Sequence, residues 1–299
     1  MSLNTSSLEG IIVKSIAGFC YVEAGEKVYE CKPRGSFRKS NISPSVGDRV
    51  EISLNGEKGV VERVFDRKNY LVRPPLSNLD KLFIVSSCSV PSVNPLLIDR
   101  MTAICEHINV EPILVFNKAD LGDFEGLPEV YSNIGYKTFV VSAETGDGVE
   151  AIKAELESSV SAFCGNSGVG KSSLLNRLLD GVSLTTGVVS EKLGRGKHTT
   201  RMVELFRVSK GYVADTPGFS TLELVDFNLK DKDELKFCFP EFEDYFGQCR
   251  FSSCTHVNEP DCAVLNAVAS GSIAKSRIQS YISMYEDLKK LKSWEINKK

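Results

Sequence analysis

The stretch 164-CGNSGVGKSSLLNRLL-179 decides the fold of the central part of the chain. It contains the pattern G-x-x-x-x-G-K-S, with an apolar run before it and a helical pattern after it, as in a phosphate-binding loop. In such a loop, backbone amides and the positive helix N-terminus hold phosphate oxygens. We therefore expect nucleotide binding by Gly165, Asn166, Ser167, Gly168, Val169, Gly170, Lys171, Ser172 and Ser173.

Two residues of this loop, and a second motif, predict how Mg²⁺ and the phosphates are held. Lys171 is expected to reach the β- and γ-phosphates as a catalytic residue, and Ser172 to bind Mg²⁺. In 215-DTPG-218, Asp215 would complete the Mg²⁺ shell and the Gly218 amide would sense the γ-phosphate. Asp-x-x-Gly is weak evidence alone, because many turns contain it.

The stretch 113-ILVFNKAD-120 indicates which base is bound. Asp120 can accept hydrogen bonds from the ring N–H and the exocyclic amine of guanine, whereas adenine would leave it unpaired. Asn117 and Lys118 would pack on the base and tie this loop to the phosphate loop. The alternative is that NKAD is only a turn between a strand and a helix.

The order of these motifs along the chain is unusual. The base reader comes first, and 142-SAETG-146 follows it, with the backbone of Ser142 and Ala143 expected to contact the guanine oxygen. The phosphate loop, a switch and DTPG come last. This order, G4-G5-G1-G2-G3, predicts a circularly permuted α/β GTPase domain over residues 74–222, with helices around a mostly parallel sheet. The segment after DTPG would then run straight into the C-terminal domain, so a phosphate-state switch could act on that domain.

The segment 194-GRGKHTTR-201 is the switch candidate. Thr200, or Thr199 in its place, can bind Mg²⁺ and support catalysis when the γ-phosphate is present. Phe219 follows DTPG, where many small GTPases carry a glutamine that orients water. His198 is the nearest residue able to orient or deprotonate that water. Alternatively, His198 is a solvated loop residue or contacts an RNA phosphate.

The first 73 residues predict a small β-barrel. Short alternating strands separated by glycine and Asn-Gly turns fit an OB-fold. The loop 32-KPRGSFRKS-40 combines cations with an aromatic ring, as nucleic-acid-binding loops do. A solvated loop on a structural barrel is the alternative. The residues expected to contact RNA are Lys32, Arg34, Phe37, Arg38 and Lys39.

Residues 223–299 predict a mainly helical domain with a metal site. The spacing Cys249-x₄-Cys254-x-His256-x₅-Cys262 supplies four soft ligands, which favours one closed, structural Zn²⁺ site. Disulfides are the alternative for these cysteines. Five others stand singly in or beside apolar runs, which suits buried thiols in a reducing cytoplasm.

The composition sets the remaining bounds. With 42% hydrophobic and 25% charged residues, the chain is typical of a folded soluble protein. A formal net charge of −3 restricts any RNA-binding surface to local patches. The absence of a long apolar run or a signal pattern predicts no membrane association.

Taken together, these motifs closely resemble the circularly permuted GTPases of the RsgA/YjeQ family over nearly the whole chain. The matching pieces are VGDRV (46–50), NKAD, SAETG, GNSGVGKSS, GRGKHTTR, DTPGF and CRFSSCTHVNEPDCAV (249–264). The resemblance implies late maturation of the small ribosomal subunit, with hydrolysis of GTP to GDP stimulated by the subunit and triggering release. It also implies that the barrel and the zinc domain contact rRNA, and that the protein alone is a monomer. A nucleotide-gated RNA-binding scaffold and a GTPase switch for a protein partner stay open as alternatives, and RNA-dependent stimulation of hydrolysis would separate them from the first interpretation.

Overall fold

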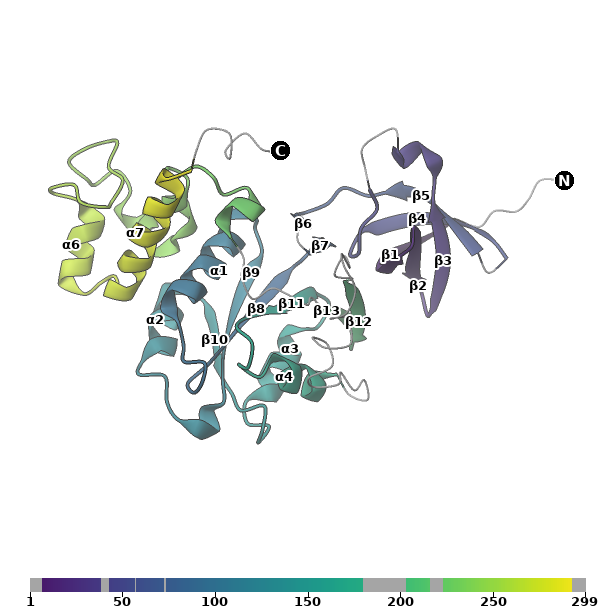
Figure 1. Ribbon diagram of the computed structural model, residues 1–299, viewed down its shortest axis with the longest axis horizontal. Coiled ribbons are helices and arrows are strands. Elements are labelled where there is room, and N and C mark those ends of the chain that lie inside the picture. Colours follow the sequence, from purple (N-terminus) through teal and green to yellow (C-terminus); the bar gives the residue numbers. More distant parts are fainter. Residues whose placement is uncertain are drawn as a thin grey trace. The chain divides into compact units, whose positions relative to one another are not determined.

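The computed structural model describes residues 7–38, 43–56, 58–72, 74–179, 203–215 and 223–291, and Figure 1 shows the arrangement of their elements. For residues 38, 55 and 215 it describes the backbone alone. Two units interleave along the sequence. One comprises residues 1–81, 149–164 and 171–219, and the other comprises residues 82–148, 165–170 and 220–299.

The first unit begins with a closed five-stranded barrel, as the sequence predicts. Antiparallel ladders join β1 to β2, β2 to β3, β4 to β5 and β1 to β4, and a parallel ladder between β3 and β5 closes the ring. Alternate residues such as Ile12, Val22 and Val61 point inward and are fully buried, which is the period-2 burial of a strand. The strands are β1 (Ser7–Ile16), β2 (Phe19–Ala24), β3 (Lys27–Pro33), β4 (Arg49–Asn55) and β5 (Lys58–Val64), and the 3₁₀ turn η1 (Gly35–Arg38) follows β3.

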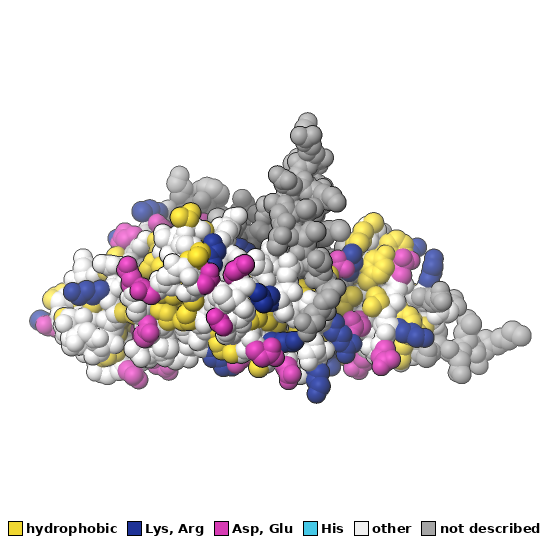
Figure 2. Space-filling model, turned by 90° about the horizontal axis from the view of Figure 1, so that it is seen from below, with side chains coloured by type: hydrophobic (Ala, Val, Ile, Leu, Met, Phe, Trp, Pro, Cys, Tyr) yellow, Lys and Arg dark blue, Asp and Glu magenta, His cyan; other side chains and the backbone are white. Residues whose placement is uncertain are grey.

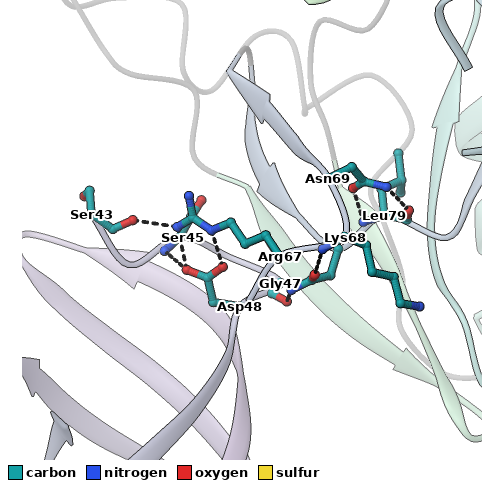
Figure 3. A network of polar contacts seen from close by, with 9 residues as sticks. Ser43, Ser45, Gly47, Asp48, Arg67, Lys68, Asn69 and Leu79 are labelled. Atoms are coloured by element: carbon teal, nitrogen blue, oxygen red, sulfur yellow. Dashed lines mark hydrogen bonds and ion pairs between the residues drawn. The ribbon is translucent and has the colours of Figure 1, made fainter. Parts of the chain in front are cut away.

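A polar network fixes the VGDRV turn of the barrel to the segment that leaves it (Figure 3). The Asp48 carboxylate, fully buried, accepts hydrogen bonds from Arg67 Nε at 2.7 Å and from the Ser45 amide at 2.7 Å. The Asn78 side chain donates to the carbonyl of Gly47 at 2.9 Å. Because a buried carboxylate needs such partners, the network explains why VGDRV carries an aspartate. The hairpin of β6 (Tyr70–Val72) and β7 (Pro75–Ser77) spans residue 73, where the sequence predicts the domain boundary.

The rest of the first unit is α/β. Strand β11 runs parallel to β13, and β12 is antiparallel to β13. Strand β12 also pairs with the barrel strand β1 at Lys14 and Glu204, whose side chains form an ion pair of 2.8 Å. The barrel and this sheet are therefore one hydrogen-bonded structure. The elements are α3 (Val149–Glu155), β11 (Val160–Cys164), α4 (Lys171–Leu178), β12 (Glu204–Val208) and β13 (Gly211–Asp215).

The second unit carries the other strands and the C-terminal helices. Strands β9 and β10 are parallel, as the alternation of strands and helices predicts. The helix α2 escaped prediction because it is only eight residues long and lies between Gly126 and Gly135, both in the left-handed conformation. The elements are β8 (Lys81–Ser87), α1 (Pro95–His107), β9 (Glu111–Asn117), η2 (Ala119–Leu121), α2 (Leu127–Ile134) and β10 (Lys137–Val140).

The C-terminal part is helical, and residues 223–291 contain no strand, in agreement with the prediction. Its longest helix, α7, lies beside α1 in Figure 1 and packs against it. The elements are η3 (Leu224–Phe227), η4 (Leu235–Cys238), η5 (Pro240–Tyr245), α6 (Ala263–Ser270) and α7 (Lys275–Lys289). In the described part of the chain, no helix is both long and apolar enough to cross a membrane.

A buried ionic network holds α7 against α1. Arg277 of α7, 1% exposed, donates from Nη1 to Asp99 Oδ1 at 2.6 Å and from Nε to Glu241 Oε1 at 2.6 Å. Tyr131 of α2 donates to the same Asp99 oxygen at 2.7 Å. The guanidinium also stacks on Phe239, 4.6 Å from the ring centroid. One arginine thus joins α1, η5 and α7, and shares the Asp99 carboxylate with α2.

Candidate nucleotide-binding site and metal centre

The phosphate loop requires glycine at two positions for steric reasons. Gly165 has φ +136° and Gly170 has φ +93°, in the region that favours glycine. A Cβ on Gly165 would lie 2.1 Å from the carbonyl oxygen of Val85, and a Cβ on Gly170 would lie 2.3 Å from Nδ2 of Asn117. The loop is therefore packed tightly against β8 and against the NKAD segment.

Asn117 joins three motifs that are far apart in the sequence. Its buried side chain donates from Nδ2 to the carbonyl of Val169 in the phosphate loop at 2.8 Å. Its Oδ1 accepts from the amide of Ala143 in the SAE loop at 2.9 Å. A side-chain amide can do both because it carries a donor and an acceptor. The structure thus brings the predicted base reader, the SAE loop and the phosphate loop into one site.

The carboxylate of Asp120, the predicted base reader, is exposed and positioned by the SAE loop. Ser142 Oγ donates to Asp120 Oδ1 at 2.5 Å, and the amide of Thr145 donates to Ser142 Oγ at 3.1 Å. The chain turns at Lys118, which has φ +67° and immediately precedes the 3₁₀ turn η2. The carboxylate is thereby held at the carboxyl end of β9, the edge where parallel sheets bind ligands.

The loop after β8 also belongs to this site, although no motif in the sequence pointed to it. Cys88 Sγ donates to the carbonyl of Lys118 at 3.0 Å, and Lys118 Nζ donates to the carbonyl of Val90 at 3.3 Å. A Cβ on Gly168 would lie 3.4 Å from Pro91. The signal that could have indicated this loop was its position at the carboxyl end of an apolar strand, β8, which lies next to β9.

Helix α4 begins at Lys171, directly after the phosphate loop, and Ser172 is its second residue. Burial lowers the pKa of the Lys171 amine below its ordinary value. A bound phosphate would oppose this effect, because a nearby negative charge favours the protonated amine. Gly218, His198, Thr199 and Thr200 lie outside the described residues, and β13 ends at Asp215, whose side chain also lies outside them.

The predicted zinc ligands converge in the C-terminal part. Their ligand atoms all lie within 4.8 Å of one another. His256 Nδ1 lies 3.6 Å from Cys249 Sγ, 3.5 Å from Cys254 Sγ and 3.3 Å from Cys262 Sγ. Sulfur at ~2.3 Å and nitrogen at ~2.0 Å from a zinc ion, at tetrahedral angles, lie about 3.5–3.8 Å apart. The four residues therefore fit one tetrahedral ion, and the three cysteines are free thiols rather than disulfide partners.

Aromatic rings and one carboxylate support the cluster. Phe246 stacks on the His256 ring at 6.1 Å, and Phe242 meets it edge-on at 6.0 Å. Glu259 accepts from Thr255 Oγ1 at 2.6 Å and from the amides of Thr255 and Val257 at 2.7 and 3.0 Å. Partial burial opposes ionisation of Glu259, but these hydrogen bonds outweigh it and lower its pKa to about 2. Glu259 thus fixes the loop between ligands, a role that ligand spacing did not reveal.

Of the residues predicted to contact RNA, the structure describes the side chains of Lys32, Arg34 and Phe37. Lys32 lies on strand β3 and is exposed, with Nζ 5.1 Å from the Phe19 ring centroid. Arg34 pairs with Glu62 at 2.8 Å, and Phe37 is half-buried in η1. The side chain of Arg38 and the whole of Lys39 lie outside the described residues.

Comparison with known proteins supports this interpretation of the geometry. The RsgA GTPase family matches residues 64–225, and the RsgA N-terminal domain family matches residues 9–61. The curated small ribosomal subunit biogenesis GTPase RsgA of Clostridium perfringens is 44% identical over 94% of this chain and 98% of its own length. The protein of that name from Caldanaerobacter subterraneus is 47% identical over 94% of this chain and 96% of its own length.

Solved structures agree. The crystal structure of YjeQ from Thermotoga maritima has a TM-score of 0.85 at 38% identity, covering 96% of this chain and all of that one. YloQ, described as a circularly permuted GTPase, has a TM-score of 0.81 at 34% identity, covering 97% of both chains. The predicted permutation and barrel are therefore confirmed. The chain is a GTPase and belongs to the RsgA family of circularly permuted GTPases.

Proposed function

We propose that this GTPase acts on the small ribosomal subunit late in its maturation and leaves the subunit when GTP is hydrolysed to GDP and phosphate. The relatives named for small-subunit biogenesis match this chain over nearly their whole length. Asn117 carries the nucleotide part of the proposal, because its two hydrogen bonds hold the base-reading and phosphate-binding loops in one site.

The proposed chemistry assigns one task to each polar residue. Asp120 reads guanine, and the backbone of Ser142 and Ala143 lies beside it to contact the guanine oxygen. Lys171 and the phosphate-loop amides hold the phosphates and offset charge that develops during transfer. Ser172, Asp215 and Thr200 would hold Mg²⁺, which would supply positive charge next to the phosphates.

The water that attacks the γ-phosphate needs a residue to position it. We assign this task to His198, because Phe219 offers no polar atom and imidazole can orient or accept a proton near neutral pH. The Gly218 amide, which precedes Phe219, would sense the γ-phosphate. Gly218 and Phe219 adjoin the chain that continues into the C-terminal domain.

We further propose that the Cys249, Cys254, His256 and Cys262 cluster holds one structural Zn²⁺. The set leaves no open ligand position, which separates it from catalytic zinc sites. The barrel and the zinc domain are the proposed rRNA-binding parts, and the GTPase domain of residues 74–222 is the nucleotide-dependent part. A role on the small subunit would place the protein in the cytoplasm, where it would act as a monomer.

Co-sedimentation tests the nucleotide-dependent cycle. The protein is mixed with purified small subunits and either a non-hydrolysable GTP analogue or GDP, and the bound fraction is measured after centrifugation through sucrose. We expect binding with the analogue and release with GDP. Equal binding in both states would support a scaffold that does not cycle, and absence of binding in both would favour a protein partner.

A further inference from the structure

The outer face of the barrel carries a groove that shares only Lys32 with the predicted RNA-binding loop 32–40. Along β3, Val28, Glu30 and Lys32 alternate with inward-facing residues and point outward. The parallel register of β3 and β5 places Lys32 opposite Val60 and Glu30 opposite Lys58. Glu30, Lys32, Lys58 and Val60, with Phe19 of β2, line a cavity of about 380 Å³. The face of the barrel seen at the right of Figure 2 shows hydrophobic side chains grouped beside charged ones.

The groove has an apolar wall. Phe19 is only half-buried, and its ring lies beneath the Lys32 amine at 5.1 Å. Val60 is 37% exposed on the neighbouring strand. A flat ring with adjacent apolar surface can accept the face of an aromatic ligand.

The groove also has a positive rim. Lys32 and Lys58 are exposed, and neither forms an ion pair with any residue in the described ranges. Nearby Arg34, in contrast, is paired with Glu62. The one carboxylate of the groove, Glu30, accepts a hydrogen bond from Tyr21 at 3.3 Å. Neither amine therefore has an anionic partner among the described residues, and the Lys32 amine contacts the Phe19 ring.

We propose that this groove binds one unpaired nucleotide of a single-stranded RNA segment, with the base stacked on Phe19 and the flanking phosphates bound by Lys32 and Lys58. Single-strand-binding proteins combine these two elements, a ring for the base and cations for the backbone. The volume lies at the lower end of the roughly 300–1,000 Å³ typical of small-ligand sites, which suits one nucleotide. A duplex would keep its bases stacked and present no base face to Phe19. The proposal deepens the proposed function, since it assigns RNA contact of the barrel to a particular surface.

Fluorescence anisotropy with the full-length protein and a labelled single-stranded RNA 12-mer of mixed sequence tests the groove. Base stacking on an aromatic ring accounts for about 5- to 150-fold in affinity, so Phe19→Ala should weaken binding by that factor at every salt concentration. The double variant Lys32→Ala/Lys58→Ala should instead reduce the slope of log affinity against log salt by about 1.4, at about 0.7 for each phosphate on a single strand.

Matched controls are available on the same domain. Tyr70 is an exposed aromatic, 41% exposed, with Arg67 over its ring at 4.5 Å, but it lies outside the groove. Lys27 is exposed at the other end of β3. Tyr70→Ala and Lys27→Ala should keep wild-type affinity, and circular dichroism should show that all variants are folded. Equal loss in Phe19→Ala and Tyr70→Ala would overturn the proposal, as would wild-type RNA binding by the groove variants.

Binding of the same variants to whole small subunits separates this inference from the proposed function. If subunits stimulate hydrolysis but the groove variants bind RNA normally, the proposed function stands and the groove proposal is wrong. Variants that bind the oligonucleotide normally but bind subunits weakly would assign the groove to a protein, which also contradicts the proposal. Impaired RNA binding without any subunit effect on hydrolysis would support the groove and refute the function.

Discussion

At the residue scale, the site depends on side chains that each have two partners. Asn117 contacts both the phosphate loop and the SAE loop, while Ser142 supports Asp120 and is itself contacted by the Thr145 amide. Removing the side chain of the buried Asn117 leaves its partners unsatisfied, which costs more than the bonds themselves contribute. Single substitutions here should therefore have distinct and separable effects.

Asp120→Asn should convert the preference from guanine to xanthine, because an amide presents the complementary donor to the xanthine oxygen. Loss of hydrogen bonds to a charged group is worth about 1.5–3 kcal/mol, so GTP affinity should fall about 10- to 150-fold while XTP affinity rises. Titration with labelled GTP and XTP measures both. The control is Asp123→Asn, an exposed carboxylate whose hydrogen-bond donor among the described residues is the Glu125 amide. Unchanged GTP preference would disprove the base-reader assignment.

Gly170→Ala should weaken binding of every nucleotide, whatever its base. The new methyl group would meet Asn117 Nδ2 at 2.3 Å, and alanine is strained at φ +93°. The phosphate loop must then shift, and the hydrogen bond from Asn117 to Val169 must lengthen. Gly126→Ala is a matched control, because that glycine has φ +76° with nothing within 4 Å of the added carbon. Equal nucleotide affinity in both variants would contradict the packing argument.

At the scale of elements, α7 is held to α1 by charges that are fully buried. Replacing one partner of a buried ion pair typically costs about 3–5 kcal/mol, whereas replacing all partners with apolar groups can be neutral. The sequence shows Arg277 as one cation in an amphipathic helix, and nothing in its spacing reveals Asp99 or Glu241 as partners. Local sequence patterns could not predict this network, because its members are distant in the sequence.

Arg277→Met should therefore lower the free energy of unfolding by about 3–5 kcal/mol, since Asp99 and Glu241 lose a buried cation. Urea denaturation followed by far-UV circular dichroism measures the loss. The triple variant Arg277→Met/Asp99→Leu/Glu241→Leu should recover most of it. Lys275→Met, at the exposed start of α7, is the control for loss of a surface charge. A loss below about 1 kcal/mol in Arg277→Met would mean that the pair contributes no more than a surface one.

The metal centre is a second test at this scale. Purified protein should contain one zinc ion per chain, and Cys254→Ser should abolish it, because the remaining three ligands do not close a tetrahedral site. Chelation should lower the melting temperature while GTP binding is retained. Cys238→Ser, which alters a buried thiol outside the cluster, should keep the zinc. Metal analysis without zinc in the wild type would refute the assignment.

Much of the fold and site was predictable because their signals are local. The glycine pattern, NKAD and the cysteine spacing each lie within a few residues, and the barrel strands show clear alternation. The loop at Cys88 and the hydrogen bonds of Glu259 were not predictable in the same way. They are tertiary contacts or backbone hydrogen bonds that residue identity alone does not specify.

At the scale of the whole molecule, the permutation determines which segment follows DTPG, the proposed γ-phosphate sensor. The first described residue after DTPG is Glu223, which pairs with Arg100 of α1 at 2.8 Å, and Arg100 also reaches Asp287 of α7 at 3.4 Å. Glu223 therefore connects, through Arg100, to helix α7 of the part that carries the Cys249, Cys254, His256 and Cys262 cluster. A change in phosphate state has a short covalent route to that part, as the proposed release from the subunit requires.

Steady-state GTP hydrolysis, with and without purified small ribosomal subunits, tests the central claim most directly when wild type and His198→Ala are compared. We expect a subunit-dependent gain in wild type that falls about 10²- to 10⁴-fold in His198→Ala, the range for loss of a general acid–base residue, with GTP binding unchanged. A gain that survives in His198→Ala would keep the subunit as the trigger and remove His198 from the chemistry. A wild-type rate that active subunits do not raise would contradict the proposed function itself.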